Sequence, residues 1–261
     1  MADRELIFDT HSHYDDEAFH DDREALLSGL REKGVGWLVN VGADIATSKQ
    51  ALELAEQYDF IYAALGVHPS ETEGLTEQDM DWIRENCHSE KVVAVGEFGL
   101  DYHWETPDRQ CQKKWFLRQI ELAKEVNLPI IIHSRDAAEE TMEILRQTKA
   151  YEGGGVIHCY SYSPEMAKTY IDMGFYIGVG GVLTFKNAKK LKRTVEEIPL
   201  EKIVLETDCP YMAPEPNRGK RNDSSYLIYV AEKIGELKGI EPEEVIRITT
   251  ENARALYRLK N

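Results

Sequence analysis

Short apolar runs alternate with amphipathic segments along the whole chain, and this alternation constrains the fold more than any other feature. Most runs are continuously apolar, as in FIYAAL and VVAV, which is typical of parallel strands covered on both faces. Eight such runs begin near Leu6, Trp37, Ile61, Val92, Pro129, Val156, Phe175 and Ile203. Eight strand-then-helix units predict an α/β fold, a TIM (β/α)8 barrel that forms a single domain over residues 1–261.

The segments between the runs carry helix signals. Ser163 and Pro164 place a capping side chain and a first-turn proline before a helix that ends at Gly174. Apolar residues recur at helical spacing among charges over 109–126 and 243–259, which predicts two outer helices. A doubly wound Rossmann sheet is the alternative, but no G-x-G-x-x-G follows the first strand, where DTHSH stands instead.

The charge balance limits how this chain could bind nucleic acid. Its 47 acidic and 31 basic residues give a net charge of −16 at pH 7. Such a charge repels polyanions and disfavours tight, non-specific binding. Any chemistry on nucleic acid would therefore have to be concentrated at a local site.

The chain carries no sign of a membrane or secretory segment. Its longest apolar run, Phe175 to Leu183, is far shorter than the roughly 20 residues that span a bilayer. The first eight residues, MADRELIF, mix charges into the region where a secretory signal is apolar. The cysteines form no C-x-x-C pair, so neither disulfides nor a cysteine zinc site is expected. We therefore expect a cytoplasmic protein.

Ionisable side chains collect where the predicted strands end. Five of the eight histidines stand at such an end: His11, His13, His68, His133 and His158. Glu97 follows VVAVG, and Asp208 lies at the end of IVLETD. Strand ends are a small part of a domain, and in a barrel they meet on one rim, where catalytic loops lie.

This arrangement predicts a metal centre. His11 and His13 are two residues apart on one strand, so their imidazoles point the same way, together with Asp9. A single such histidine is more often a core residue than a ligand, but six polar groups on one rim would be costly without a cation among them. The predicted metal ligands are His11, His13, Glu97, His133, His158 and Asp208.

Two divalent ions are expected, because six ligands are too many for one catalytic ion that keeps a position open for water. Glu97 could bridge the pair with its two oxygens. Ions roughly 3.5 to 4 Å apart can stabilise both the attacking and the departing oxygen of a displacement. Histidine-rich sites favour zinc, manganese or nickel, so the identity of the metal stays open.

Eight ordered motifs extend over nearly the whole chain: FDTHSH at 8–13, GVHP at 66–69, GEFGLDYH at 96–103, HSRDA at 133–137, HCYS at 158–161, GVGGVLTFKNA at 178–188, ETDCPYMAP at 206–214 and RGKRN at 218–222. In this order they resemble the TatD family of metal-dependent deoxyribonucleases. The resemblance implies a TIM-barrel hydrolase that cleaves DNA, often as a 3′-to-5′ exonuclease on single strands and commonly with magnesium. By position it implies a first ion on His11, His13 and Asp208, a second on His133 and His158, and Glu97 as the bridge.

The predicted catalytic residues are Asp208 and Glu97. A metal-bound water would lose a proton and attack phosphorus, with Asp208 orienting or deprotonating it. The expected substrate is single-stranded DNA, and neither a membrane nor an obligatory protein partner is expected.

Further residues near the strand ends could contact the substrate. Phosphate contacts are predicted for His68, His103, Arg135, Arg218 and Arg221. Each of these could instead fix a loop or carry a solvated charge. Stacking on unpaired bases is conceivable for Tyr102, Trp104, Tyr160 and Phe185, although packing under loops is the simpler expectation.

Two other functions stay open. The same site could act at carbon, as a metal-dependent amidohydrolase or a D-aminoacyl-tRNA deacylase, although Glu97 stands where many amidohydrolases carry a modified lysine. The chain could also be a catalytically silent barrel that binds nucleic acid or protein, which the complete ligand set disfavours. Assays on single-stranded DNA and on an aminoacyl ester would separate these functions.

Overall fold

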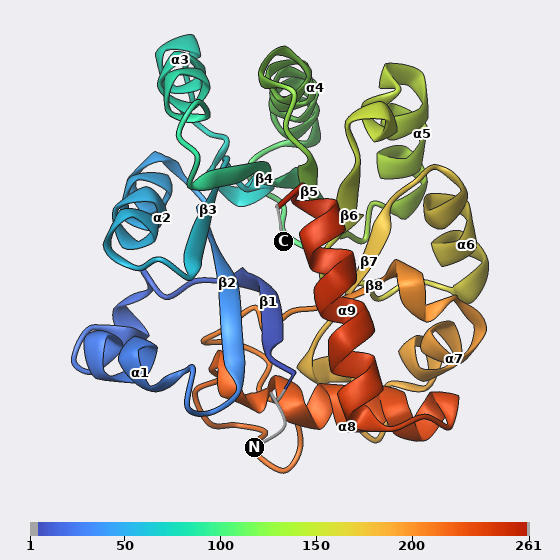
Figure 1. Cartoon of the computed structure of the whole chain (residues 1–261). Coiled ribbons are helices and arrows are strands. Elements are labelled where there is room, and N and C mark those ends of the chain that lie inside the picture. Colours follow the sequence, from blue (N-terminus) through green and yellow to red (C-terminus); the bar gives the residue numbers. More distant parts are fainter. Residues whose placement is uncertain (1–4, 260–261) are drawn as a thin grey trace.

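The computed structural model describes residues 5–259 and confirms the predicted TIM barrel (Figure 1). Residues 1–4, which begin the MADRELIF segment, and residues 260–261 lie outside this range. Eight strands form one sheet in sequence order, and each pair of neighbours is parallel. The strands are β1 (Ile7–Ser12), β2 (Val35–Val41), β3 (Ile61–Leu65), β4 (Val92–Asp101), β5 (Ile130–Arg135), β6 (Gly155–Ile157), β7 (Tyr176–Val179) and β8 (Ile203–Leu205). Each starts within two residues of its predicted position.

The ring closes between the segment after β8 and the first strand. The backbone N–H of Asp208 donates to the carbonyl of His11 at 2.9 Å, and that of His13 donates to the carbonyl of Cys209 at 3.0 Å. Ser12 and Cys209 also form a parallel bridge. The sequential strand order excludes the doubly wound alternative, in which the order reverses at a switch point.

Helices surround the ring: α1 (Arg23–Gly29), α2 (Ile45–Gln57), α3 (Glu77–Asn86), α4 (Arg109–Val126), α5 (Ala138–Thr148), α6 (Pro164–Asp172), α7 (Lys189–Glu197), α8 (Leu227–Lys238) and α9 (Pro242–Leu256). The helix predicted over 109–126 is α4. Ser163 caps α6 by accepting a hydrogen bond from the Met166 N–H. The helix predicted over 243–259 is α9, which ends earlier because Arg258 takes a left-handed conformation. Within residues 5–259, no helix has both the length and the apolar character needed to cross a bilayer.

The last helix closes one end of the barrel. Figure 1 shows α9 lying across the ring of strands. The Asn252 side chain donates to the carbonyls of Leu200 and Ile203, where β8 begins. The Tyr257 hydroxyl reaches into the barrel and donates to the carbonyl of Thr10 at 2.8 Å, beside Phe8. This packing seals the amino ends of the strands, so the carboxyl ends remain open for a site.

Candidate metal centre

The six predicted ligands lie together at the carboxyl ends of the strands. They come from five places in the ring: β1, β4, β5, the residue after β6 and the segment after β8. Three overlapping groups have ligand atoms within 4.8 Å of one another: His11, His158 and Asp208; His11, His13 and Glu97; His68, Glu97 and His133. The barrel topology therefore brings side chains almost 200 residues apart in sequence into one cluster.

The Glu97 carboxylate lies between two pairs of imidazoles. Its Oε1 is 3.5 Å from His11 Nε2 and 3.6 Å from His13 Nε2. Its Oε2 is 3.1 Å from His158 Nε2 and 3.5 Å from His133 Nδ1. Each oxygen thus faces one pair, which is the arrangement required of a carboxylate that bridges two cations.

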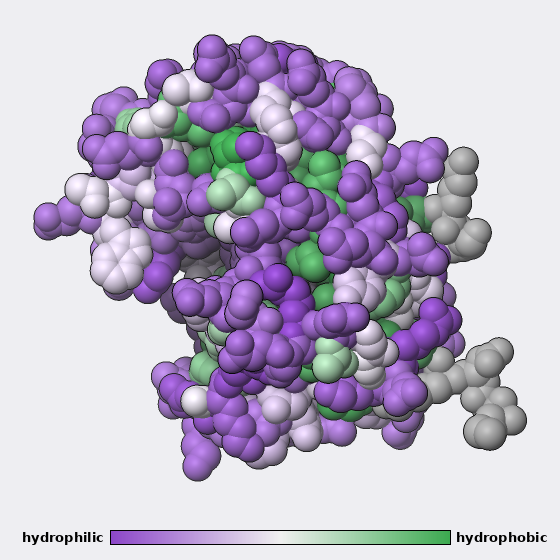
Figure 2. Space-filling model, turned by 90° about the vertical axis from the view of Figure 1, so that its left-hand side faces the viewer, coloured by the Kyte–Doolittle hydropathy of each residue, from purple (hydrophilic) through white to green (hydrophobic). Residues whose placement is uncertain are grey.

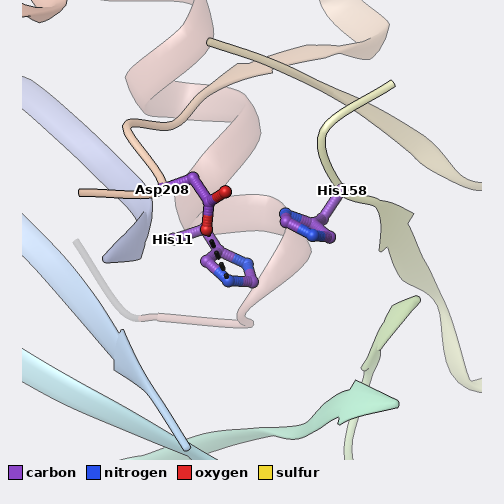
Figure 3. A group of neighbouring side chains, drawn as sticks. All are labelled: His11, His158 and Asp208. Atoms are coloured by element: carbon purple, nitrogen blue, oxygen red, sulfur yellow. Dashed lines mark ion pairs between the residues drawn. The ribbon is translucent and has the colours of Figure 1, made fainter. Parts of the chain in front are cut away.

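Asp208 lies beside the first pair of imidazoles, those of His11 and His13. Its Oδ1 lies 3.2 Å from His13 Nε2 and 3.7 Å from His11 Nε2. Figure 3 shows the carboxylate directed at the His11 ring, with the His158 ring alongside; the two rings are stacked with centroids 4.0 Å apart. The backbone hydrogen bond from Asp208 to His11 holds the segment after β8 against β1.

The donor atoms fit divalent cations. The two Nε2 atoms of His11 and His13 are 3.2 Å apart, and His133 Nδ1 is 3.4 Å from His158 Nε2. Nitrogen lone pairs do not attract one another, so an electropositive centre between them relieves the repulsion. Glu97 Oε2 is buried and accepts no hydrogen bond within residues 5–259. Imidazole and carboxylate together suit zinc, manganese and related ions.

The protonation equilibria show that the cluster attracts positive charge. Burial disfavours protonation of His13, but the hydrogen bond and charge of Asp208 outweigh it and raise the pKa of His13 to about 10. Burial is likewise outweighed at His158, where Glu97 raises the pKa to about 9. The same contacts overcome burial and lower the pKa of Glu97 and of Asp208. Both carboxylates are therefore anions, and bound cations would take the place of the imidazole protons.

Neighbouring acceptors select which nitrogen of a ligand faces the centre. His13 Nδ1 lies 2.8 Å from the carbonyl of Val41, which can only accept, so Nδ1 keeps its proton and Nε2 is the nitrogen that can exchange its proton for a cation. His133 Nε2 lies 3.1 Å from Asp101 Oδ2, so its Nδ1 faces the centre instead. Asp101 is a site residue that the sequence reasoning missed. The signal was present, because Glu97, Gly99 and Asp101 alternate on β4 and so share one face.

Two buried acids support the cluster without joining it. Asp9, which was expected on the face of His11 and His13, accepts hydrogen bonds from the Thr207 and Ser224 hydroxyls at 2.7 and 2.6 Å. Glu206 Oε1 accepts the Cys159 N–H at 2.5 Å and lies 3.8 Å from His158 Nδ1. Burial raises the pKa of Glu206 to about 7.

A cleft of about 970 Å³ opens over the cluster. His68 and Arg135, two of the predicted substrate contacts, line it. Nδ1 of His68 accepts the Ser70 N–H, and burial lowers the pKa of His68 to about 3, so the ring is neutral with its proton on Nε2. It can therefore donate a hydrogen bond. Arg135 is exposed, and no ion pair to it is found within residues 5–259.

The other three predicted contacts are not among the described residues that line the cleft, and each meets another side chain. His103 Nδ1 lies 3.4 Å from Asp136 Oδ2, and the Arg218 guanidinium lies over the Phe185 ring at 4.2 Å. Arg221 donates to both oxygens of Asp22, at 2.7 and 2.6 Å.

The four aromatic residues that could stack on bases also differ in their surroundings. Three of them pack against other side chains, as expected: Tyr160 is buried, the Tyr102 hydroxyl donates to Glu140, and Phe185 lies under Arg218. Trp104 is different, because it lines the cleft and is 59% exposed. Tyr211, which the sequence reasoning did not single out, also lines the cleft and is 57% exposed.

Comparison with known proteins adds a family assignment to this geometry. The family model described as "TatD related DNase" matches residues 8–258. The chain is 50% identical to the uncharacterized metal-dependent hydrolase YabD of Bacillus subtilis (strain 168), a match covering 97% of this chain and 100% of YabD. It is 31% identical to the 3′-5′ ssDNA/RNA exonuclease TatD of Salmonella typhimurium, covering 96% and 98%. The solved structure of YJJV, a TatD homolog from Escherichia coli K12, superposes with a TM-score of 0.91 at 31% identity, covering 97% and 98%.

Proposed function

We propose that this chain, which belongs to the TatD-related DNase family and is a metal-dependent hydrolase, cleaves phosphodiester bonds at the 3′ end of single-stranded DNA. The observation that carries the proposal is the position of Glu97, with one carboxylate oxygen facing each pair of imidazoles. The naming of the Salmonella relative as a 3′-5′ ssDNA/RNA exonuclease supports the choice of substrate and direction.

The ligand assignment follows the distances. His11, His13 and Asp208 would hold one divalent ion, His133 and His158 would hold the other, and Glu97 would bridge them. When bound, such ions acidify a coordinated water and neutralise charge that develops on the phosphate oxygens. Magnesium, manganese and zinc are the proposed candidates.

The protein residues would orient the water and the phosphate. Asp208 Oδ1 faces the imidazoles of His11 and His13, and its second oxygen can accept the proton of the attacking water. His68 Nε2 can donate to a phosphate oxygen in the cleft, and Arg135 can pair with the same group. The free thiols of Cys87, Cys111, Cys159 and Cys209 suit the proposed cytoplasmic location.

The test is cleavage of 5′-end-labelled single-stranded DNA by protein loaded with magnesium, manganese or zinc, combined with elemental analysis of the protein as purified. We expect a ladder that shortens from the 3′ end, no cleavage after treatment with chelator, and recovery when metal is added back. Asp208→Asn should abolish turnover without unfolding the chain, because one oxygen remains as a ligand while the proton acceptor is lost. Normal activity in this variant, or in the presence of chelator, would contradict the proposal.

Adding an aminoacyl-ester substrate to this experiment distinguishes phosphodiester cleavage from the alternative chemistry. A metal-activated water in this cleft could also attack the carbonyl carbon of an aminoacyl ester. Hydrolysis of a D-aminoacyl-tRNA with no cleavage of DNA or RNA would assign the centre to acyl transfer. An RNA strand of the same sequence, tested in parallel, shows whether the enzyme prefers deoxyribose or ribose.

A further inference from the structure

Two of the most exposed aromatic side chains of this protein lie at its cleft. Hydrophilic side chains cover most of the face drawn in Figure 2, and hydrophobic residues are visible only in small areas between them. Among the described residues, the exposed large hydrophobic side chains are Trp104, Leu117, Tyr211 and Ile240. Trp104 and Tyr211 line the cleft above the metal centre, whereas Leu117 lies on α4. Exposed aromatic surface is unfavourable in water, so its placement at a cleft points to a ligand.

Each ring is held in place although most of it is exposed. The Tyr211 N–H donates to the carbonyl of Asp208 at 3.0 Å, and its hydroxyl donates to Asp16 Oδ2 at 3.0 Å. The His103 ring meets the Trp104 ring edge-on, with centroids 4.8 Å apart, and His103 is itself paired with Asp136. Rings fixed in this way lose little conformational freedom when a ligand stacks on them.

The charge of the cleft limits what that ligand can be. Asp15, Asp16 and Glu17 line it beside Tyr211, so the phosphates of a nucleic acid are repelled along that side. Arg23 also lines this side, where its guanidinium donates to the carbonyls of Asp15 and Asp16, but the three carboxylates outnumber it. Uncharged contacts are therefore the favoured source of affinity there. Stacking of a base on an aromatic ring is such a contact, and it is insensitive to sequence because every base has a π-face. Bases inside a duplex are already stacked on their neighbours and cannot offer that face without being unpaired.

We propose that Trp104 and Tyr211 are stacking platforms for unpaired bases and restrict the enzyme to single-stranded ends. This inference rests on the proposed phosphodiesterase function and adds the determinant of strand selectivity. It assigns His103 the task of supporting Trp104, and Asp16 the task of supporting Tyr211.

The experiment compares three substrates of equal length with the metal-loaded full chain: a single strand, the same strand with abasic sites at its two 3′-terminal positions, and a blunt duplex. Trp104→Ala and Tyr211→Ala remove the platforms, and Trp104→Phe and Tyr211→Phe keep a ring, the latter without the hydroxyl bonded to Asp16. Leu117→Ala is the matched control, since it removes an exposed apolar side chain outside the cleft.

The wild-type protein should prefer the normal strand over both other substrates. Each alanine variant should lose roughly 5- to 150-fold in kcat/KM on the normal strand, mainly through KM, and should cut normal and abasic strands at more similar rates. The phenylalanine variants and Leu117→Ala should keep most of the preference. A wild-type protein that cuts the abasic strand or the duplex as well as the single strand would overturn this inference alone, as would alanine variants with normal kcat/KM. A wild-type protein that cuts no strand would overturn the proposed function as well.

Discussion

Replacing Asp101 with asparagine should weaken the binding of one of the two proposed metal ions and leave the other unaffected. Asp101 uses both carboxylate oxygens: Oδ1 accepts the His103 N–H at 2.9 Å, and Oδ2 accepts the Nε2 proton of His133 at 3.1 Å. An asparagine has only one acceptor oxygen. If that oxygen keeps the His103 bond, its NH₂ group faces Nε2 of His133, which must then give up its proton. The proton moves to Nδ1, the atom that faces Glu97.

The size of the effect follows from this conflict. Binding an ion at His133 Nδ1 would require the ring to change tautomer and the amide to turn, which leaves the His103 N–H without its acceptor. This N–H is only partly buried, so the change costs about as much as one lost hydrogen bond, about 0.5 to 1.5 kcal/mol. This corresponds to a loss of roughly 2- to 13-fold in affinity. The upper end of this range reaches the roughly 10- to 100-fold effects typical of residues that orient metal ligands.

Calorimetric titration of metal-stripped protein with manganese or zinc measures the two affinities separately. We expect the site on His11, His13 and Asp208 to keep its affinity and the site on His133 and His158 to lose it. Asp136→Asn is the matched control, because it removes the same charge from an exposed neighbour whose carboxylate lies beside the His103 ring. Two unchanged affinities would refute the tautomer argument, and an equal loss at both sites would show that the variant acts on the whole cluster instead.

Three further perturbations test the site and the barrel. Metal at a hundred times its dissociation constant should stabilise the fold by about 2.7 kcal/mol, which raises Tm by roughly 5 to 10 °C. Chelator should reverse the rise, and an unchanged Tm in a thermal scan would count against metal binding. Gly178→Ala places a Cβ 2.2 Å from Glu206 Oε2, so urea denaturation should show a loss of about 1 to 3 kcal/mol, and wild-type stability would mean that Glu206 moves freely. Tyr257→Phe removes the hydroxyl that donates to Thr10 inside the barrel, which should cost about 0.5 to 1.5 kcal/mol in the same assay; no change would show that α9 does not depend on this bond.

The ring of strands and the proximity of the six candidate ligands could be predicted from the sequence because both follow from local patterns. Each apolar run identifies a strand, and in a barrel the residues that follow the runs must meet at one rim. That is why Glu97 and Asp208, which are 111 positions apart in the sequence, could be expected beside His11 and His13. The distances from Glu97 to the imidazoles agree with that expectation.

Contacts between loops could not be predicted in the same way. Arg221 looked like a phosphate ligand because it belongs to a local basic cluster, yet it is paired with Asp22, 199 residues earlier. That pairing depends on how the segment after β8 folds back over the segment after β1. Neither segment has a periodic sequence pattern from which its conformation could be predicted. Tyr211 was missed for the same reason, since its exposure is a property of the folded loop.

The nitrogen with which each candidate histidine faces the site could be predicted only in part. The sequence gives the positions of His13 and His133. The nitrogen that each presents is determined by an acceptor on a neighbouring strand: the Val41 carbonyl on β2 for His13, and Asp101 on β4 for His133. The second contact requires β4 and β5 to approach closely, with Gly99 opposite His133 in the register. A Cβ at Gly99 would lie 1.9 Å from the His133 carbonyl oxygen, so a side chain there would push the two strands apart. Gly99 therefore contributes to the candidate metal centre as Glu97 does, because it permits the register in which Asp101 can orient His133.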